Sequence, residues 1–308
     1  MDVAASFSPQ GNGLLPTAAQ LFERLPRTLR RHRLMKAYMA LTGESPLQLV
    51  RIRDRHFGYA DMSDGFLRLI VIDGDFEREF FALADALLAR GGVFIDAGAN
   101  FGLLSCGLAG QHGAKVKFHV FEPNPALVQW IERSAARYPV MDCKVNCAAV
   151  SDCDGSVSFN VNVGQTGASH ISFEGGEQVR SVTIDAYLDR ENIATVPLMK
   201  MDIEGYELTA VRGAAKSLQS RRIQAVYFEY FEKYLIRVAP PRDLLAAFDA
   251  LGFEVCFCRQ ADIAAPDASL TIRADLPGHG IALRPVAGQP MPPMTDLLAV
   301  PKENLAAL

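Results

Sequence analysis

The stretch Gly91-Gly-Val-Phe-Ile-Asp-Ala-Gly-Ala-Asn-Phe-Gly-Leu-Leu-Ser105 decides the fold of this chain. It begins with a short apolar run at residues 93–95, which predicts a buried strand, and then passes through Asp96 into two glycines four positions apart. Leucines at helical spacing follow from Leu103 onward. The stretch therefore predicts a strand, a tight turn and the start of a helix.

The two glycines of this turn, Gly98 and Gly102, indicate a ligand site. Glycine adopts backbone angles that other residues avoid, and it lets a ligand approach the main chain closely. The free N–H groups at the start of the following helix would face a group that carries negative charge. The spacing D-x-G-x-x-x-G differs from the G-x-G-x-x-G of dinucleotide-binding proteins, so an NAD-dependent oxidoreductase is disfavoured.

A second strand is expected over residues 115–122, and it ends in an acid, Glu122. An acid about 20 residues after a glycine turn is the usual partner of ribose hydroxyls. Asp96, at the tip of the first strand, can face the amino group of an amino-acid moiety. Together the two strand tips describe a site for a nucleoside joined to an amino acid, which is S-adenosylmethionine.

Four segments resemble, in order, the four signatures of FkbM-type S-adenosylmethionine-dependent methyltransferases, over roughly residues 50 to 303. The resemblance implies a Rossmann-like class I methyltransferase: an α/β fold with a doubly wound, mostly parallel seven-stranded sheet and an antiparallel last strand. It also implies methyl transfer to a hydroxyl of a sugar, glycan precursor or secondary metabolite, with S-adenosylhomocysteine as product. The segments are Phe94-Ile-Asp-Ala-Gly-Ala-Asn-Phe-Gly-Leu-Leu-Ser105, Val120-Phe-Glu-Pro-Asn124, Val182-Thr-Ile-Asp-Ala-Tyr-Leu188 and Lys200-Met-Asp-Ile-Glu-Gly-Tyr-Glu207.

The alternation of expected strands and helices agrees with an α/β fold. We expect an N-terminal tail with a basic helical extension at residues 1–49, and a Rossmann-like methyltransferase domain at residues 50–308. Within that domain, an inserted β-hairpin is expected at about residues 155–184, and a long loop rich in Pro and Gly at about residues 260–295.

The expected cofactor site gathers at the glycine turn and the strand tips. Ala148 and Ala149 end the expected third strand, and their fold position would let these small side chains line an adenine pocket. Asn100 and Ser105 would hold the carboxylate end of the cofactor or the helix start. The full expected set is Asp96, Gly98, Ala99, Asn100, Phe101, Gly102, Ser105, Glu122, Pro123, Asn124, Ala148, Ala149 and Asp202.

Three side chains are expected to serve the chemistry, because transfer to a hydroxyl is helped by a base that removes its proton. Asp202 and Glu204 follow the fourth strand, and two nearby carboxylates tend to raise the pKa of one member. His170 lies in the hairpin loop and titrates near neutral pH. Glu229, after the fifth strand, is a further candidate for the acceptor pocket. We assign no metal site, although Asp202 and Glu204 could together hold magnesium.

Composition and charge set the expectations for partners and compartment. A net charge of −4 argues against wholesale binding to nucleic acid, and no apolar run reaches the length of a membrane helix. We therefore expect a cytoplasmic protein whose partner is a small-molecule acceptor, and the sequence leaves a homodimer possible. The six cysteines lack paired spacing and are expected to be reduced thiols.

Two functions from other classes stay open. An arginine-rich segment at residues 24–36 could grip RNA in an RNA methyltransferase, or it could form a solvated helix face. A non-catalytic partner protein that binds the cofactor would share the same fold, because a fold alone does not fix a function.

Overall fold

The structure is a computed structural model of the 308-residue chain. It describes residues 47–52, 55–65, 76–161, 170–171, 175–258, 270–273 and 280–304, together with the single positions 34, 37, 40, 41, 67 and 70. The basic segment at residues 24–36 therefore lies almost entirely outside the described residues, and its predicted helix and role stay predictions. Within the described part of the chain, every helix is too short or too polar to cross a membrane.

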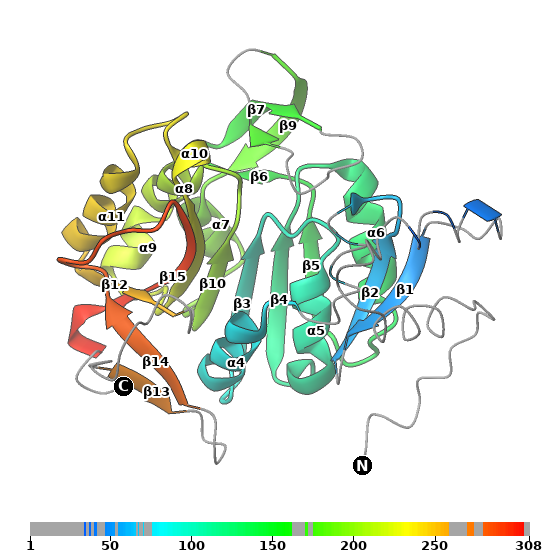
Figure 1. Ribbon diagram of the computed structural model, residues 1–308, viewed down its shortest axis with the longest axis horizontal. Helices are drawn as coiled ribbons and strands as arrows, with labels where there is room; N and C mark the ends of the chain where they lie inside the picture. The colour runs from blue at the N-terminus through cyan, green and yellow to red at the C-terminus, as the bar shows by residue number, and fades with distance from the viewer. Residues whose placement is uncertain are drawn as a thin grey trace.

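A large sheet runs through the centre of the molecule (Figure 1) in the order β13-β14-β12-β15-β11-β10-β3-β4-β5. Its five strands from β11 to β5 pair in parallel, whereas β15 pairs antiparallel with both β11 and β12. The strands are β3 (Gly92–Ala97), β4 (Val116–Phe121), β5 (Cys143–Asn146), β10 (Leu198–Met201), β11 (Val226–Phe231), β12 (Phe253–Phe257), β13 (Leu270–Arg273), β14 (Gly280–Pro285) and β15 (Met294–Pro301).

The predicted seven-stranded sheet is present within this larger one, from β12 to β5, with its antiparallel strand in place. Two more strands, β14 and β13, extend the edge beyond β12 and make nine. They fall inside residues 260–295, so this stretch is not the continuous loop that its Pro and Gly content predicted. The composition misleads here because two short edge strands need few consecutive apolar residues.

Helices cover both faces of the sheet, as a doubly wound fold requires. Alternate residues of one strand enter different cores: Phe94 of β3 belongs to one hydrophobic cluster and Ile95 to the other. The first core packs against α4 (Arg78–Leu87), α5 (Leu103–His112) and α6 (Pro125–Ala135). The second packs against α7 (Ile184–Arg190), α8 (Glu207–Gly213), α9 (Ala215–Gln219) and α11 (Pro241–Ala250).

A second, four-stranded sheet stands above the carboxyl ends of the parallel strands, at the top of Figure 1. The prediction of a simple inserted hairpin is therefore incomplete. The expected third strand over residues 142–150 also divides: β5 joins the large sheet, whereas Ala149 belongs to the small one. The strands of the small sheet are β6 (Ala149–Val150), β7 (Gly155–Asn160), β8 (His170–Ile171) and β9 (Glu177–Val182), in the order β6-β9-β7-β8.

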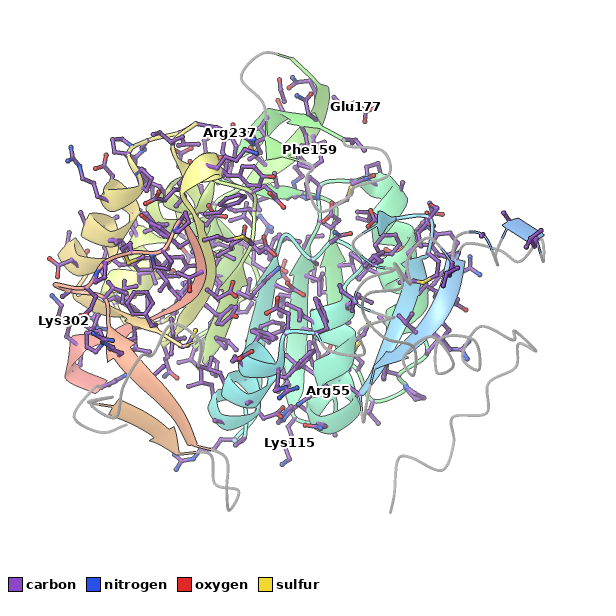
Figure 2. The ribbon with its side chains drawn as sticks, in the orientation of Figure 1. Arg55, Lys115, Phe159, Glu177, Arg237 and Lys302 are labelled. Atoms are coloured by element: carbon purple, nitrogen blue, oxygen red, sulfur yellow. The ribbon has the colours of Figure 1, made fainter. Side chains whose placement is uncertain are left out.

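An N-terminal hairpin of β1 (Leu47–Ile52) and β2 (Arg55–Asp61) packs over α5 and α6, at the right of Figure 1. Gly58 of β2 makes the close approach possible, because a Cβ atom there would lie 2.1 Å from Ser134 Oγ of α6. Arg55 pairs with Asp85 of α4 and lies at the lower end of the molecule in Figure 2. The hairpin thus covers helices that lead away from the strand tips.

Candidate functional site

A cavity of about 570 Å³ opens at the carboxyl ends of the parallel strands, the edge at which open α/β sheets bind ligands. The turns after β3, β4 and β10 line it, together with β11, β15 and the start of α4. Phe159 of β7, near the top of Figure 2, and Ile171 of β8 line it from the small sheet. The two sheets therefore enclose one site between them.

The turn after β3 has the backbone that its glycines predicted. Gly98 has φ 78° and Gly102 has φ 69°. A Cβ atom on Gly98 would lie 1.9 Å from the carbonyl oxygen of Asp202, so only glycine lets this turn pass the tip of β10. Asn100 between them is also left-handed, with φ 53°. The turn and the end of β10 thus form one continuous wall.

Glu122 follows β4 and connects two turns at the cavity. Its Oε2 accepts a hydrogen bond of 2.8 Å from the N–H of Asn100, and its Oε1 accepts one of 2.9 Å from the N–H of Asn124. Burial raises the pKa of Glu122 to about 7, although both backbone hydrogen bonds oppose the shift. Asn124 in turn caps α6 by accepting from the N–H of Ala126.

An ion-pair network forms part of the cavity wall, with Lys200 and Asp202 at the surface and Asp96 buried behind them. Lys200 Nζ donates to the carbonyl oxygen of Gly98 at 3.1 Å, and lies 3.3 Å from Asp202 Oδ2 and 3.7 Å from Asp96 Oδ1. Asp96 is fully buried, and its Oδ2 accepts from Ser105 Oγ at 2.7 Å. Burial works against the charge of Lys200, but Asp202, Asp96 and Glu77 outweigh it and raise the pKa of the lysine.

This network revises the expected position of Asp96. The acid lies at the tip of β3 as predicted, but it is turned inward and burial raises its pKa. The cavity surface beside it is formed by Lys200 and Gly98 instead. Four of the expected cofactor residues therefore support the wall from behind: Asp96, Gly102, Ser105 and Asn124. The others form its surface, namely Gly98, Ala99, Asn100, Phe101, Glu122, Pro123, Ala148, Ala149 and Asp202.

Glu204 has the properties of a functional acid. It adopts a left-handed backbone with φ 58°, which costs about 1 to 3 kcal/mol for a residue other than glycine. Its Oε2 is buried and accepts no hydrogen bond from any described residue. Burial, followed by repulsion from Asp202 and Glu207, raises its pKa to about 8. Glu207, by contrast, holds the loop between β10 and α8, because its Oε1 accepts from the N–H groups of Ile203 and Gly205.

Several cavity residues escaped the sequence reasoning as site residues, and Lys200 and Glu77 are two charged ones among them. Glu77 precedes α4 with φ 47°, and its Oε2 accepts a hydrogen bond of 3.4 Å from Tyr227 Oη. Burial, then Asp296 and Asp202, raise the pKa of Glu77 to about 8. No motif marks this residue. Lys200 could have been predicted as a site residue from the sequence, because it interrupts the apolar run of a buried strand, and a buried lysine needs a charged partner.

His170 lies in β8, and its side chain is outside the described part of the structure. Its expected role as a base therefore stays a prediction. Glu229 of β11 lines the cavity. Among the described residues, no group of three or more His, Cys, Asp or Glu side chains is arranged to hold a metal ion.

Comparison with known proteins places this geometry in a family. The sequence matches the family described as "Methyltransferase FkbM domain" over residues 96–255, just over half of the chain. Hexuronic acid methyltransferase AglP of Haloferax volcanii is 26% identical over 129 residues, which are 42% of this chain and 52% of that protein. The chain thus spans about half the length of this relative.

Two solved structures are similar to parts of the chain. Methyltransferase FkbM of Methylobacillus flagellatus KT has a TM-score of 0.39 and 19% identity, over 54% of this chain and 39% of that one. Precorrin-6y C5,15-methyltransferase of Geobacter metallireducens GS-15 has a TM-score of 0.38 and 10% identity, over 73% of this chain and 87% of that one.

Proposed function

The chain belongs to the FkbM family of S-adenosylmethionine-dependent methyltransferases, and from this premise we propose that it methylates a hydroxyl group of a small molecule, first of all a sugar or glycan precursor. A secondary metabolite is the second acceptor class. The observation that carries the proposal is the cavity itself, which brings the glycine turn, Glu122 and the acid Glu204 to one edge of the sheet. The distant similarity to a hexuronic acid methyltransferase supports a sugar acceptor.

The lining of the cavity fits S-adenosylmethionine. When bound, this cofactor supplies an electrophilic methyl group on a positively charged sulfonium. Lys200 is the one cationic side chain among the described lining residues, and it is already paired with carboxylates. Acids dominate the remaining charge, which suits a cofactor with a sulfonium and an ammonium group. Each carboxylate oxygen of Glu122 accepts one hydrogen bond from a described backbone N–H group, which leaves a lone pair on each oxygen for the ribose hydroxyls.

The chemistry that remains for the protein is to position the acceptor, exclude water and hold a proton. Holding the reacting groups together can by itself supply several orders of magnitude in rate. Glu204 suits the role of base, because its buried Oε2 faces no competing hydrogen-bond donor among the described residues. Asp202 suits the role less well, since its Oδ2 lies 3.3 Å from Lys200 Nζ, which competes with an acceptor hydroxyl for that oxygen. We therefore propose that Glu204 takes up the proton of the acceptor hydroxyl. Asp202 would instead orient the ammonium group of Lys200.

A calorimetric titration with S-adenosylhomocysteine, with NAD as the control, tests the proposed function. We expect micromolar binding of the first compound and no binding of the second. Absence of binding by either compound would contradict the assignment and would indicate a cofactor site that has closed or decayed. Binding of NAD alone would move the protein to the oxidoreductases.

Replacing Glu122 with alanine is expected to weaken binding of S-adenosylhomocysteine by about 1.5 to 3 kcal/mol. The ribose hydroxyls would lose the carboxylate as their proposed acceptor, and so would the N–H groups of Asn100 and Asn124. Calorimetry on the folded variant measures the change. Glu132→Ala, which removes an exposed acid of α6, is the matched control and should bind like the parent. Equal affinity for both variants would remove Glu122 from the cofactor site.

A further inference from the structure

The small sheet contributes four described residues to the cavity lining, and each of them is apolar. They are Ala149, Val150, Phe159 and Ile171. Phe159 of β7 and Ile171 of β8 are register partners in an antiparallel pair, so their side chains stand next to each other on one face of the sheet. This face meets the cavity above the strand tips, and Figure 2 labels Phe159 there. We call Phe159 and Ile171 the small-sheet pair.

The small-sheet pair is part of a hydrophobic core that joins the two sheets. Phe159 and Ile171 are buried in one cluster with Ala149, and Ile203 of the loop after β10 packs against this cluster. A Cβ atom on Gly98 would lie 3.0 Å from Ile203 Cγ2, which places the isoleucine against the glycine turn. An apolar surface therefore runs from the small sheet to the turn that is expected to hold the cofactor.

This apolar surface begins beside Glu122, the acid proposed to bind the ribose. The carbonyl oxygen of Asn146, at the end of β5, accepts hydrogen bonds from the N–H groups of Glu122 at 3.1 Å and of Ala148 at 2.9 Å. Glu122 and Ala148 are therefore held close together, and Ala149 of the buried cluster follows Ala148 in the chain. The surface starts where a group attached to the ribose would lie.

The group attached to the ribose of the cofactor is its adenine base. An adenine ring is flat and uncharged, and its faces gain free energy against aromatic and apolar side chains. Phe159 offers an aromatic ring and Ile171 an apolar side chain, and Pro123, which follows Glu122, also lines the cavity. The chemistry of the surface therefore matches the base better than the charged amino-acid end of the cofactor.

A sugar acceptor fits this surface poorly. Its hydroxyl groups would lie against the side chains of Phe159 and Ile171, which offer no hydrogen-bonding group, and burying unpaired hydroxyls costs free energy. Acids that can pair with hydroxyls lie elsewhere in the cavity, since Glu204 follows β10 and Glu229 belongs to β11. Two strands, β3 and β10, separate β4 from β11, which is roughly 14 Å at about 4.8 Å per strand. The β11 side of the cavity is therefore the better place for the acceptor.

Hydrogen bonds fix the small sheet to the rest of the fold. Asp154, in the turn between β6 and β7, accepts from the N–H and the hydroxyl group of Thr183 at 3.1 and 3.2 Å, and Thr183 caps α7. Ser181 of β9 donates from its Oγ to the carbonyl oxygen of Cys153 at 2.9 Å. These bonds tie the small sheet to the start of a helix that packs on the large sheet. The small-sheet pair therefore stands on a supported wall.

We propose that the small sheet is a cofactor-binding element, in which Phe159 and Ile171 cover the adenine base of S-adenosylmethionine. The inference rests on the proposed function. It assigns the inserted sheet to the methyl donor and leaves the acceptor to the β11 side of the cavity. The two side chains act by positioning: they hold the nucleoside against Ala149 and Ile203, and so fix where the methyl group lies.

Calorimetric titration of the full chain with S-adenosylhomocysteine tests the contact. Phe159→Leu keeps an apolar side chain but removes the aromatic face, and it should weaken binding by about threefold to tenfold. Ile171→Val removes one carbon from the same surface and should weaken binding by about twofold to fourfold, which keeps the test open if Phe159→Leu fails to fold. Phe231→Leu makes the same exchange on β11 and should bind like the parent.

A second control separates contact with the ligand from packing of the sheet. Val157 of β7 packs against the same buried cluster as Phe159 but lies outside the cavity lining. Val157→Ala should therefore keep the parent affinity. An equal loss in Val157→Ala or Phe231→Leu would overturn the inference, and so would parent-like binding by folded Phe159→Leu and Ile171→Val proteins.

Nuclear Overhauser effects identify the part of the ligand that the small-sheet pair contacts. In the complex of S-adenosylhomocysteine with protein isotope-labelled at Phe and Ile, we expect the adenine protons to contact the Phe159 ring and the Ile171 methyl groups. Contacts of this pair with the amino-acid part alone, or with no part of the bound ligand, would overturn the inference and leave the proposed function in place. If the parent protein does not bind S-adenosylhomocysteine, the proposed function fails and this inference fails with it.

Discussion

Replacing Glu204 with glutamine is expected to lower kcat by a factor of about 10² to 10⁴, the usual contribution of a general base. Glutamine keeps the size and one acceptor oxygen of the side chain but cannot take up a proton. Affinity for S-adenosylhomocysteine should change little, because the nucleoside end of the cavity is formed by other residues. Single-turnover methylation of an accepted sugar measures the loss, and calorimetry checks the affinity.

The pH dependence of kcat/KM provides a second, independent test of the role of Glu204 as the general base. Its pKa is raised to about 8, so the carboxyl is protonated and inactive as a base below that pH. Activity should therefore rise with pH and reach half its maximum near pH 8. Glu77 has a similar raised pKa, so Glu77→Gln is the matched control, and it should keep the profile. A profile centred near pH 10 would transfer the base role to Glu229, whose pKa is raised to about 10.

Lys200→Met is expected to destabilise the folded protein by about 3 to 5 kcal/mol, the scale for breaking a buried ion pair from one side. The variant leaves Asp96 fully buried without its cation, and it frees Asp202 and the carbonyl oxygen of Gly98 from their donor. Urea unfolding at pH 7 measures the free energy of unfolding.

A double variant tests whether the buried charge causes this loss. Adding Asp96→Asn to Lys200→Met removes the orphaned carboxylate, while the asparagine oxygen can still accept from Ser105. We expect the double variant to recover about half or more of the lost stability, because the two sites interact directly. A double variant as unstable as Lys200→Met alone would show that packing of the lysine stem matters more than its charge.

Much of the fold follows from local sequence patterns. Three local signals predict one strand–turn–helix unit: the apolar run of β3, the glycines after it and the leucines of α5. The strand, the turn and the start of the helix could therefore be placed within a residue or two. Glu122 could be assigned to the strand tip because the end of β4 and the Pro-Asn pair after it are local signals. The antiparallel position of β15 came from the family resemblance, since no local pattern sets the direction of a strand.

The parts that escaped prediction depend on contacts between distant segments. Asp96 was expected at the cavity surface, but its register partner Lys200, across β3 and β10, draws it into the interior. Glu77 enters the site only because α4 begins beside β11, a relation that no spacing in the sequence encodes. The small sheet pairs Ala149 with Ser181, more than thirty residues away. Such pairings are set by the packed fold and are not visible in local periodicity.

The carboxylate of Glu122 has a consequence for the timing of cofactor binding. Its hydrogen bonds from the N–H groups of Asn100 and Asn124 hold the turns after β3 and β4 together through the protein's own groups. A pocket fixed in this way loses little conformational entropy on binding and needs no slow rearrangement. Association should then proceed at a rate set by encounter, so that changes in affinity among cofactor analogues would arise mainly from how long each one stays bound.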